Sequence, residues 1–275
     1  MVDISKIDYS SLDSTMVSAS LFYPRPEWGA PSDDGAAESI RIPVERDVVV
    51  GARLHMAAAE AATILFFHGN GEIVADYDDL GIVYTDMGIN FLPVDYRGYG
   101  RSTGRPTVTA IMRDCHTVFA YVKGHLKKKG YNGPLIVMGR SLGSAPALEL
   151  AFHYRDEIDG LILDSGFAYA GPLLGLFGID MHALGIGEEQ GFRNLDKIRG
   201  FDKPTLVIHA EFDHIISFSE GQLLFEASPS GHKKFLRISG ADHNDIFSHG
   251  MSVYLESVNW LVDKSSELRQ NTMLK

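Results

Sequence analysis

A serine flanked by glycines is the first feature of this sequence that could do chemistry. The segment GRSLG at positions 139–143 follows an apolar run at residues 135–138 and precedes an alanine- and leucine-rich run at residues 145–152. A buried strand, a turn of the form G-x-S-x-G and a helix form a sharp corner that leaves the serine hydroxyl exposed at its tip. The glycines let the strand and the helix pack closely. This pattern predicts that Ser141 is a nucleophile.

An acid and a base follow apolar, strand-like runs later in the chain. Asp213 comes after residues 205–208, and His243 comes after residues 235–238. A serine that transfers acyl groups needs a neutral imidazole to accept its proton and a carboxylate to hold that imidazole in the correct tautomer. We therefore predict His243 as the base and Asp213 as the acid. Asp164, at the end of an earlier apolar run, is the alternative acid.

Metal and nucleotide chemistry have no support in the sequence. There is no H-E-x-x-H motif and no cluster of cysteines and histidines at ligand spacing, so no metal is expected. No G-x-G-x-x-G follows a strand-like run and no G-x-x-x-x-G-K-[ST] occurs, so no cofactor is expected either.

The elements that position these residues alternate between strand-like and helical patterns. Continuous apolar runs indicate strands that are covered on both faces. Alternation of strands and helices indicates a mainly parallel, doubly wound sheet, in which ligands bind outside the carboxyl ends of the strands. The expected strands are residues 64–67, 90–94, 135–138, 161–163, 206–208 and 235–238, and the expected helices are residues 77–87, 108–128, 144–154, 220–227 and 251–264.

Three regions depart from this alternation. Residues 40–57 contain alternating apolar positions and predict an antiparallel hairpin at one edge of the sheet. Residues 1–38 are polar, rich in turn formers and match no motif, so we treat them as a leader ahead of a domain at residues 39–275. An insertion at about residues 166–202 combines glycines with large apolar side chains.

The chain resembles the α/β-hydrolase superfamily, in the branch of serine carboxylesterases, monoacylglycerol lipases and acyl-protein thioesterase-like proteins. The resemblance spans about residues 40–262. It is carried by HGNG at 68–71, DYRGYGRS at 95–102, GRSLG at 139–143, Asp213 and His243. The segment after Asp213 has Ser217 where the family often has proline, which is a minor departure.

The resemblance implies an α/β-hydrolase fold with a mainly parallel sheet, an antiparallel N-terminal edge and a short cap at residues 166–202. It also implies an oxyanion hole made by the main-chain amides of Asn70 and Leu142. His68 then shapes the oxyanion loop rather than acting as a base. Arg140 is expected to pack or to form an ion pair with a partner that the sequence does not identify.

The cap suggests an apolar wall for an acyl group. Its candidate pocket residues are Leu173, Leu174, Leu176 and Phe177. The expected function is hydrolysis of carboxylic esters or thioesters with small to medium acyl groups. A peptidase, amidase or acyltransferase on the same triad is the alternative. A non-catalytic ligand-binding protein on this fold is a further one, although such proteins usually lose a triad residue.

Composition limits the partners and the cellular location that we expect for the protein. The net charge of −11 argues against nucleic acid as a partner and leaves a small-molecule ester or thioester as the expected one. A single cysteine, Cys115, excludes an intrachain disulfide and fits a cytoplasmic location. The first residues do not read as a signal peptide, and no apolar run is long enough to predict a membrane span. The sequence leaves the oligomeric state open.

Overall fold

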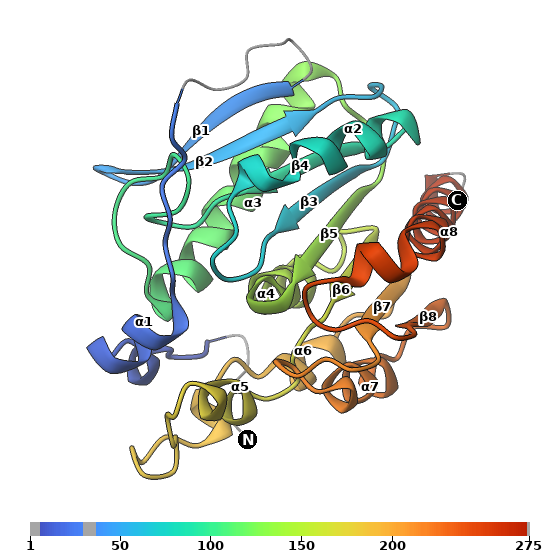
Figure 1. Ribbon diagram of the computed structural model, residues 1–275. Coiled ribbons are helices and arrows are strands. Elements are labelled where there is room, and N and C mark those ends of the chain that lie inside the picture. The colour runs from blue at the N-terminus through green and yellow to red at the C-terminus, as the bar shows by residue number, and fades with distance from the viewer. Residues whose placement is uncertain (1–5, 30–36, 274–275) are drawn as a thin grey trace.

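The computed structural model describes residues 6–29 and 37–273, and an eight-stranded sheet organises them (Figure 1). The strands are β1 (Ala37–Glu45), β2 (Val48–His55), β3 (Thr63–Phe67), β4 (Asn90–Val94), β5 (Leu135–Arg140), β6 (Gly160–Asp164), β7 (Thr205–Ala210) and β8 (Lys233–Ile238). The α-helices are α1 (Thr15–Leu21), α2 (Asp78–Asp86), α3 (Val108–Lys129), α4 (Ser144–His153), α5 (Ala170–Leu176), α6 (Asn194–Ile198), α7 (Phe218–Ala227) and α8 (Ile246–Met273).

The strand order confirms the predicted fold class. The order is β1-β2-β4-β3-β5-β6-β7-β8. Strand β2 pairs antiparallel with both β1 and β4, and every other neighbouring pair is parallel. The antiparallel edge therefore lies at the N-terminal end of the domain, as the alternating residues of this hairpin predicted.

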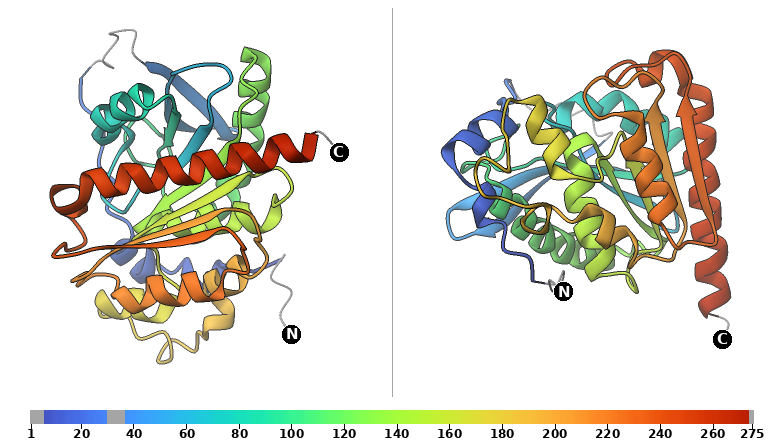
Figure 2. Two further views of the ribbon diagram at one scale, coloured as in Figure 1. Left: turned by 90° about the vertical axis from the view of Figure 1, so that its right-hand side faces the viewer. Right: turned by 90° about the horizontal axis from the view of Figure 1, so that it is seen from below.

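Both faces of the sheet are covered, which explains the continuous apolar runs. Successive side chains of a strand point to opposite faces. Leu65 and Phe67 of β3 accordingly join the core under α3 and α4, while Ile64 and Phe66 join the core under α2 and α8. Figure 2 shows α8 running along one side of the sheet and α7 on the other.

The leader and the insertion meet at the carboxyl end of the sheet. Of the predicted leader at 1–38, residues 6–29 are described and include α1, whereas residues 1–5 and 30–36 lie outside the described part. Between β6 and β7, the predicted cap region forms α5 and α6. Figure 1 shows α1 and α5 at the same end of the molecule, the end toward which β3 and β5 point.

The last helix differs from its prediction. Helix α8 begins before the predicted start at residue 251 and continues beyond 264, with an interruption at Gly250, whose φ of −148° and ψ of 27° are not helical. Ser265, one residue past the predicted end, is still buried, so the helix keeps an inner face beyond residue 264. None of the helices in the described ranges is both long and apolar enough to cross a bilayer.

Candidate active site

The turn after β5 holds Ser141 in a conformation that non-glycine residues rarely adopt. Ser141 has a φ of 51°, in the left-handed region. A Cβ on Gly143 would collide with the carbonyl oxygen of Phe67, and a Cβ on Gly139 would collide with the carbonyl oxygen of Gly143. The two glycines are therefore needed for the close approach of β3, β5 and the start of α4. The strained serine is held at the tip of this turn.

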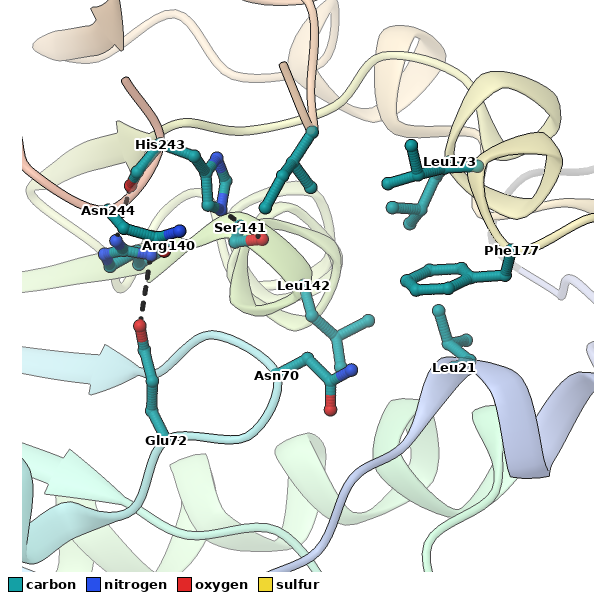
Figure 3. Close-up of a pocket in the computed structure, with 12 residues that line it drawn as sticks. Leu21, Asn70, Glu72, Arg140, Ser141, Leu142, Leu173, Phe177, His243 and Asn244 are labelled. Atoms are coloured by element: carbon teal, nitrogen blue, oxygen red, sulfur yellow. Dashed lines mark hydrogen bonds and ion pairs between the residues drawn. The ribbon is translucent and has the colours of Figure 1, made fainter. Parts of the chain in front are cut away.

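Three residues from separate strand ends lie in hydrogen-bond contact. Nε2 of His243 is 3.1 Å from Oγ of Ser141, and Nδ1 of His243 is 2.7 Å from Oδ2 of Asp213. Figure 3 shows the imidazole of His243 directed at the serine hydroxyl. With a proton on Nδ1 donated to Asp213, the lone pair of Nε2 faces the hydroxyl. This geometry allows the hydroxyl proton to pass to the imidazole.

The carboxylate of Asp213 is held by its own loop. Its Oδ1 accepts hydrogen bonds from the amides of Ile215 and Ile216, at 3.0 and 2.8 Å. Burial by itself raises the pKa of Asp213, but the hydrogen bond and charge of His243 and the amide of Ile216 outweigh it and lower the pKa. The carboxylate is consequently ionised at neutral pH, as an acid that orients an imidazole must be.

The alternative acid, Asp164, has other partners. Its oxygens accept hydrogen bonds from Tyr254 Oη and Ser165 Oγ, each at 3.1 Å. Asp164 is only 1% exposed, and this burial raises its pKa. The structure therefore brings Asp213, and not Asp164, into hydrogen-bond contact with His243.

A buried ion pair connects three loops of the site. Nη1 of Arg140 lies 3.1 Å from Oε1 of Glu72, and Nη2 of Arg140 donates to the carbonyl oxygen of His243 at 2.8 Å (Figure 3). The other oxygen of Glu72 accepts from the amide of Gly69 at 2.6 Å and from the hydroxyl of Tyr77 at 2.5 Å. Burial opposes the charge on Arg140, but the carboxylate of Glu72 outweighs it and raises the pKa of the guanidinium.

The loop after β3 brings Asn70 to the same cavity as Leu142. The side-chain oxygen of Asn70 accepts hydrogen bonds from the amide of Tyr23 at 2.9 Å and from the hydroxyl of Tyr99 at 2.7 Å. His68 is fully buried, and its Nδ1 lies 2.7 Å from the carbonyl oxygen of Gly69. These contacts fix the loop that carries Asn70, whose main-chain amide is a predicted oxyanion donor.

A cavity of about 200 Å³ opens beside Ser141. Figure 3 shows Leu21, Leu173 and Phe177 on one side of it, and Glu72 and Arg140 on the other. The described residues that line it are Leu21, Asn70, Glu72, Arg140, Ser141, Leu142, Leu173, Leu176, Phe177, Ile215, His243 and Asn244.

One predicted pocket residue lies elsewhere. Leu174 is fully buried in the hydrophobic core and is not among the residues that line the cavity. Successive residues of an α-helix point about 100° apart, and on α5 it is Leu173 that lines the cavity while Leu174 turns into the core. The sequence interpretation that placed both in one wall is corrected in this respect.

One group of side chains with metal-ligand chemistry comes together in the described ranges. Ligand atoms of His116, Glu149 and His153 all lie within 4.8 Å of one another. The carboxylate of Glu149, however, also contacts Nζ of Lys197 at 2.5 Å and accepts from Tyr9 Oη at 2.9 Å. Because a buried ammonium already balances its charge, we interpret the group as an ion-pair network that joins α3, α4, α6 and the N-terminal segment.

Five residues that line the cavity were not assigned to it from the sequence, namely Leu21, Glu72, Arg140, Ile215 and Asn244. Glu72 follows the HGNG segment but carries no pattern of its own, and Asn244 directly follows His243. Leu21 belongs to the leader, for which no motif was found. Arg140 was expected to have an ion-pair partner, but only the folded chain identifies that partner as Glu72.

Comparison with known proteins gives the class. The family described as serine aminopeptidase, S33, matches residues 58–178. The alpha/beta hydrolase domain-containing protein 17C of Xenopus tropicalis is 30% identical over 233 residues, which cover 82% of this chain and 70% of that protein. The chain therefore belongs to the α/β-hydrolase superfamily.

Two further proteins resemble this chain, one in sequence and one in fold. The alpha/beta hydrolase domain-containing protein aho-3 of Caenorhabditis elegans is 31% identical over 211 residues, or 73% of this chain and 57% of that protein. This chain thus spans little more than half of that relative's length. An esterase from Pyrococcus furiosus has the same fold, with a TM-score of 0.69 and 17% identity over 88% of this chain and 97% of that chain.

Proposed function

We propose that this chain is a serine hydrolase that cleaves carboxylic esters or thioesters with small to medium acyl groups. The observation that carries the proposal is the hydrogen-bonded series Ser141, His243 and Asp213 beside an apolar cavity. A serine hydroxyl is a weak nucleophile at neutral pH, and an oriented imidazole is the usual means of activating it.

The proposed reaction has two halves. Oγ of Ser141 attacks the carbonyl carbon while Nε2 of His243 accepts its proton, and the carbonyl π electrons move to oxygen. The tetrahedral intermediate then collapses to an acyl-enzyme, and the departing alkoxide or thiolate takes the proton from His243. In the second half, water gives a proton to His243 as it adds to the acyl carbon. The second tetrahedral intermediate then collapses, Oγ of Ser141 takes this proton from His243 as its bond to the acyl carbon breaks, and the carboxylic acid leaves.

The oxyanion of each tetrahedral intermediate needs donors that are already in place. We assign this role to the main-chain amides of Leu142 and Asn70. Support comes from their position, since both residues line the cavity next to Ser141. Leu142 lies in the short turn at Ser141–Gly143 that leads into α4, and the amino-terminal end of a helix favours negative charge. Each such donor typically contributes about 3 kcal/mol to the stability of the transition state.

The size of the cavity favours a short acyl group. Its volume of about 200 Å³ is below the roughly 300–1,000 Å³ of most small-molecule sites. Leu173 and Phe177 form an apolar wall on one side of it (Figure 3). An acyl chain of modest length would be buried against this wall.

An aminopeptidase is the second candidate, because the matching family carries that description. Such an enzyme needs a carboxylate to hold the α-ammonium group of its substrate. Glu72 is the one carboxylate among the described residues that line the cavity, and Arg140 already neutralises it. This pairing favours the ester or thioester over the peptide as substrate.

The test compares wild type, Ser141→Ala and Ser144→Ala. Ser144 is a buried serine of the same turn, and its Oγ donates to the carbonyl oxygen of Ser141 rather than contacting an imidazole. We expect wild type and Ser144→Ala to hydrolyse p-nitrophenyl butyrate and to react with a fluorophosphonate probe. Ser141→Ala should lose both activities by several orders of magnitude.

Two outcomes would reject the proposal. One is ester turnover that persists in a pure preparation of Ser141→Ala. The other is a wild-type protein that neither hydrolyses esters nor reacts with the probe. Turnover of aminoacyl p-nitroanilides faster than that of esters would instead favour the aminopeptidase.

A further inference from the structure

Residues 14–25, here called the N-terminal strap, lie against the active site although they belong to the leader. The side chain of Ser14 caps α1 by accepting a hydrogen bond from the amide of Val17 at 3.2 Å. Val17 and Leu21 are buried in the main hydrophobic core, so the inner face of α1 is firmly packed. The strap is therefore an ordered part of the domain.

Two contacts tie the strap to the loop that carries Asn70. The amide of Tyr23 donates to Oδ1 of Asn70 and to Oη of Tyr99, both at 2.9 Å. Nε of Arg25 donates to the carbonyl oxygen of Gly71 at 3.0 Å. Since Tyr99 also donates to Oδ1 of Asn70 at 2.7 Å, the Asn70 side chain is held by two donors from different parts of the chain.

The strap also contacts the cap and forms part of the cavity wall. Leu21 lines the cavity, and Figure 3 shows it close to Phe177. The ring of Tyr23 lies 6.5 Å from the ring of Phe177, measured between centroids. The apolar wall therefore has two sources, α5 of the cap and α1 of the strap.

We propose that the strap completes the active site: Leu21 limits the length of acyl group that fits, and the amide of Tyr23 positions Asn70 for catalysis. This inference rests on the proposed function and deepens it. Leu21 is a specificity-determining residue in this scheme. Tyr23 is a positioning residue, because it acts through Asn70 and does not touch the reacting atoms.

The first experiment tests the wall. Leu21→Ala removes three carbons from the end of the cavity, so the preferred p-nitrophenyl ester should become two or three carbons longer. The value of kcat/KM should rise by about fourfold for each additional methylene that is buried. Activity on acetate should stay within about twofold of wild type. Leu21→Phe should shift the preference toward shorter esters.

Two control variants separate specificity from lost stability. Leu12→Ala removes the same atoms from a fully buried leucine of the leader that does not line the cavity, and Met16→Ala removes an exposed apolar side chain of α1. Neither should change the chain-length profile. If Leu21→Ala keeps the wild-type profile, or if Leu12→Ala shifts it in the same way, the strap does not set specificity.

The second experiment tests the positioning contact. Tyr23→Pro removes both the ring and the donating N–H, whereas Tyr23→Ala removes the ring and keeps the N–H. The effect of the N–H is therefore read from the comparison of the two variants. The backbone suits this change, because Phe22 has the extended φ of −120° and ψ of 126° that a residue before proline adopts. We expect kcat to fall by roughly fivefold to a hundredfold in Tyr23→Pro with little change in KM, and to stay near wild type in Tyr23→Ala.

A third variant keeps this test decisive if Tyr23→Pro does not fold. Tyr99→Phe removes the other donor to Asn70 and retains the buried ring, and its kcat should fall in the same way. Unchanged kcat in folded Tyr23→Pro or Tyr99→Phe would overturn the positioning role. If kcat is unchanged and a fluorophosphonate still reacts with Ser141 in every variant, the positioning role of the strap is rejected and the proposed function is not. A wild type that does not react would reject the proposed function itself.

Discussion

The guanidinium of Arg140 donates a hydrogen bond to the carbonyl oxygen of His243 at 2.8 Å. The same guanidinium forms an ion pair with Glu72, which in turn accepts from the amide of Gly69. Arg140 is the last residue of β5 and immediately precedes Ser141, so one side chain connects the turn of Ser141 with the loops that carry His243 and Asn70. The relative placement of these three loops depends on it.

Replacing this arginine should therefore impair both catalysis and folding. For Arg140→Gln we expect kcat to fall by one to two orders of magnitude with a smaller change in KM, since a displacement of about 1 Å at a site can cost a hundredfold in rate. We also expect a loss of about 3 kcal/mol in the free energy of unfolding, because the partly buried carboxylate of Glu72 loses the guanidinium that balances its charge. Ester kinetics and urea unfolding measure the two effects.

The double variant Arg140→Gln/Glu72→Gln is the control for this pair. It removes the unpaired carboxylate and should be more stable than Arg140→Gln alone, while kcat remains low. A folded Arg140→Gln protein with wild-type kcat would contradict the positioning role of the guanidinium.

The choice between two carboxylates gives a second prediction. Asp213→Asn keeps the shape of the loop but removes the charge that accepts the proton of His243 Nδ1. We expect kcat to fall by about four orders of magnitude, as expected when the imidazole adopts the wrong tautomer. Asp164→Asn should keep most of the activity, because Asp164 bonds to Tyr254 and Ser165 instead.

Measurements on p-nitrophenyl butyrate, together with circular dichroism to verify folding, decide this comparison. The assignment of the acid would be reversed if folded Asp164→Asn were inactive and Asp213→Asn remained active.

The sheet and the strand-end residues could be predicted because each depends on a short stretch of sequence. A run of apolar residues specifies a strand covered on both faces, and parallel strands deliver their following residues to one edge. Ser141 and Asp213 follow the buried strands β5 and β7, and His243 follows the less buried edge strand β8, so order along the chain was sufficient to group them.

Features that depend on packing between distant segments could not be predicted in this way. The partners of Arg140 lie 68 and 103 positions away along the chain, as the numbers of Glu72 and His243 show. Leu21 reaches the cavity only because α1 packs on the main core, and nothing in the pattern of the leader indicates this. Leu174 was misplaced because the glycine-rich insertion gave no clear helical register before the fold was known.

The buried side chain of His209 leads to a prediction about how the stability of the protein depends on pH. This imidazole is fully buried, and its Nε2 donates to the carbonyl oxygen of Ile216 at 2.8 Å, next to the Asp213 loop. Burial lowers the pKa of His209, although Ile216 and Asp213 act in the opposite direction. The unfolded chain, with an ordinary histidine pKa of about 6.5, therefore binds a proton before the folded protein does.

Stability should consequently fall as the pH drops below about 6.5, with a contribution from His209 of up to about 1.4 kcal/mol per pH unit. His209→Gln retains a donor but does not titrate, so its stability should decline less steeply over the same range. Urea unfolding at pH 7.5, 6.5 and 5.5 gives the two slopes, and all other titrating groups are common to both proteins. Parallel slopes would show that His209 is not the group responsible.

The cap provides the last prediction. Leu173 and Phe177 line the cavity, so they should contribute binding energy that grows with the length of the acyl chain. Each buried methylene is worth about 0.8 kcal/mol, or about a fourfold gain in kcat/KM, until the cavity is full. The variant Leu173→Gln/Phe177→Gln should flatten this increase from acetate to octanoate and leave acetate turnover nearly unchanged.

Leu174→Ala is the matched control, because Leu174 lies in the same helix but in the core. It should lower the free energy of unfolding by about 2–5 kcal/mol and leave the chain-length profile as it is. Reaction with a small fluorophosphonate should proceed at the wild-type rate in both proteins, since neither change touches Ser141. If the double variant instead loses acetate and octanoate turnover equally, the cap supports the fold without forming the acyl wall. The limit on chain length would then have to come from Leu21 and the strap.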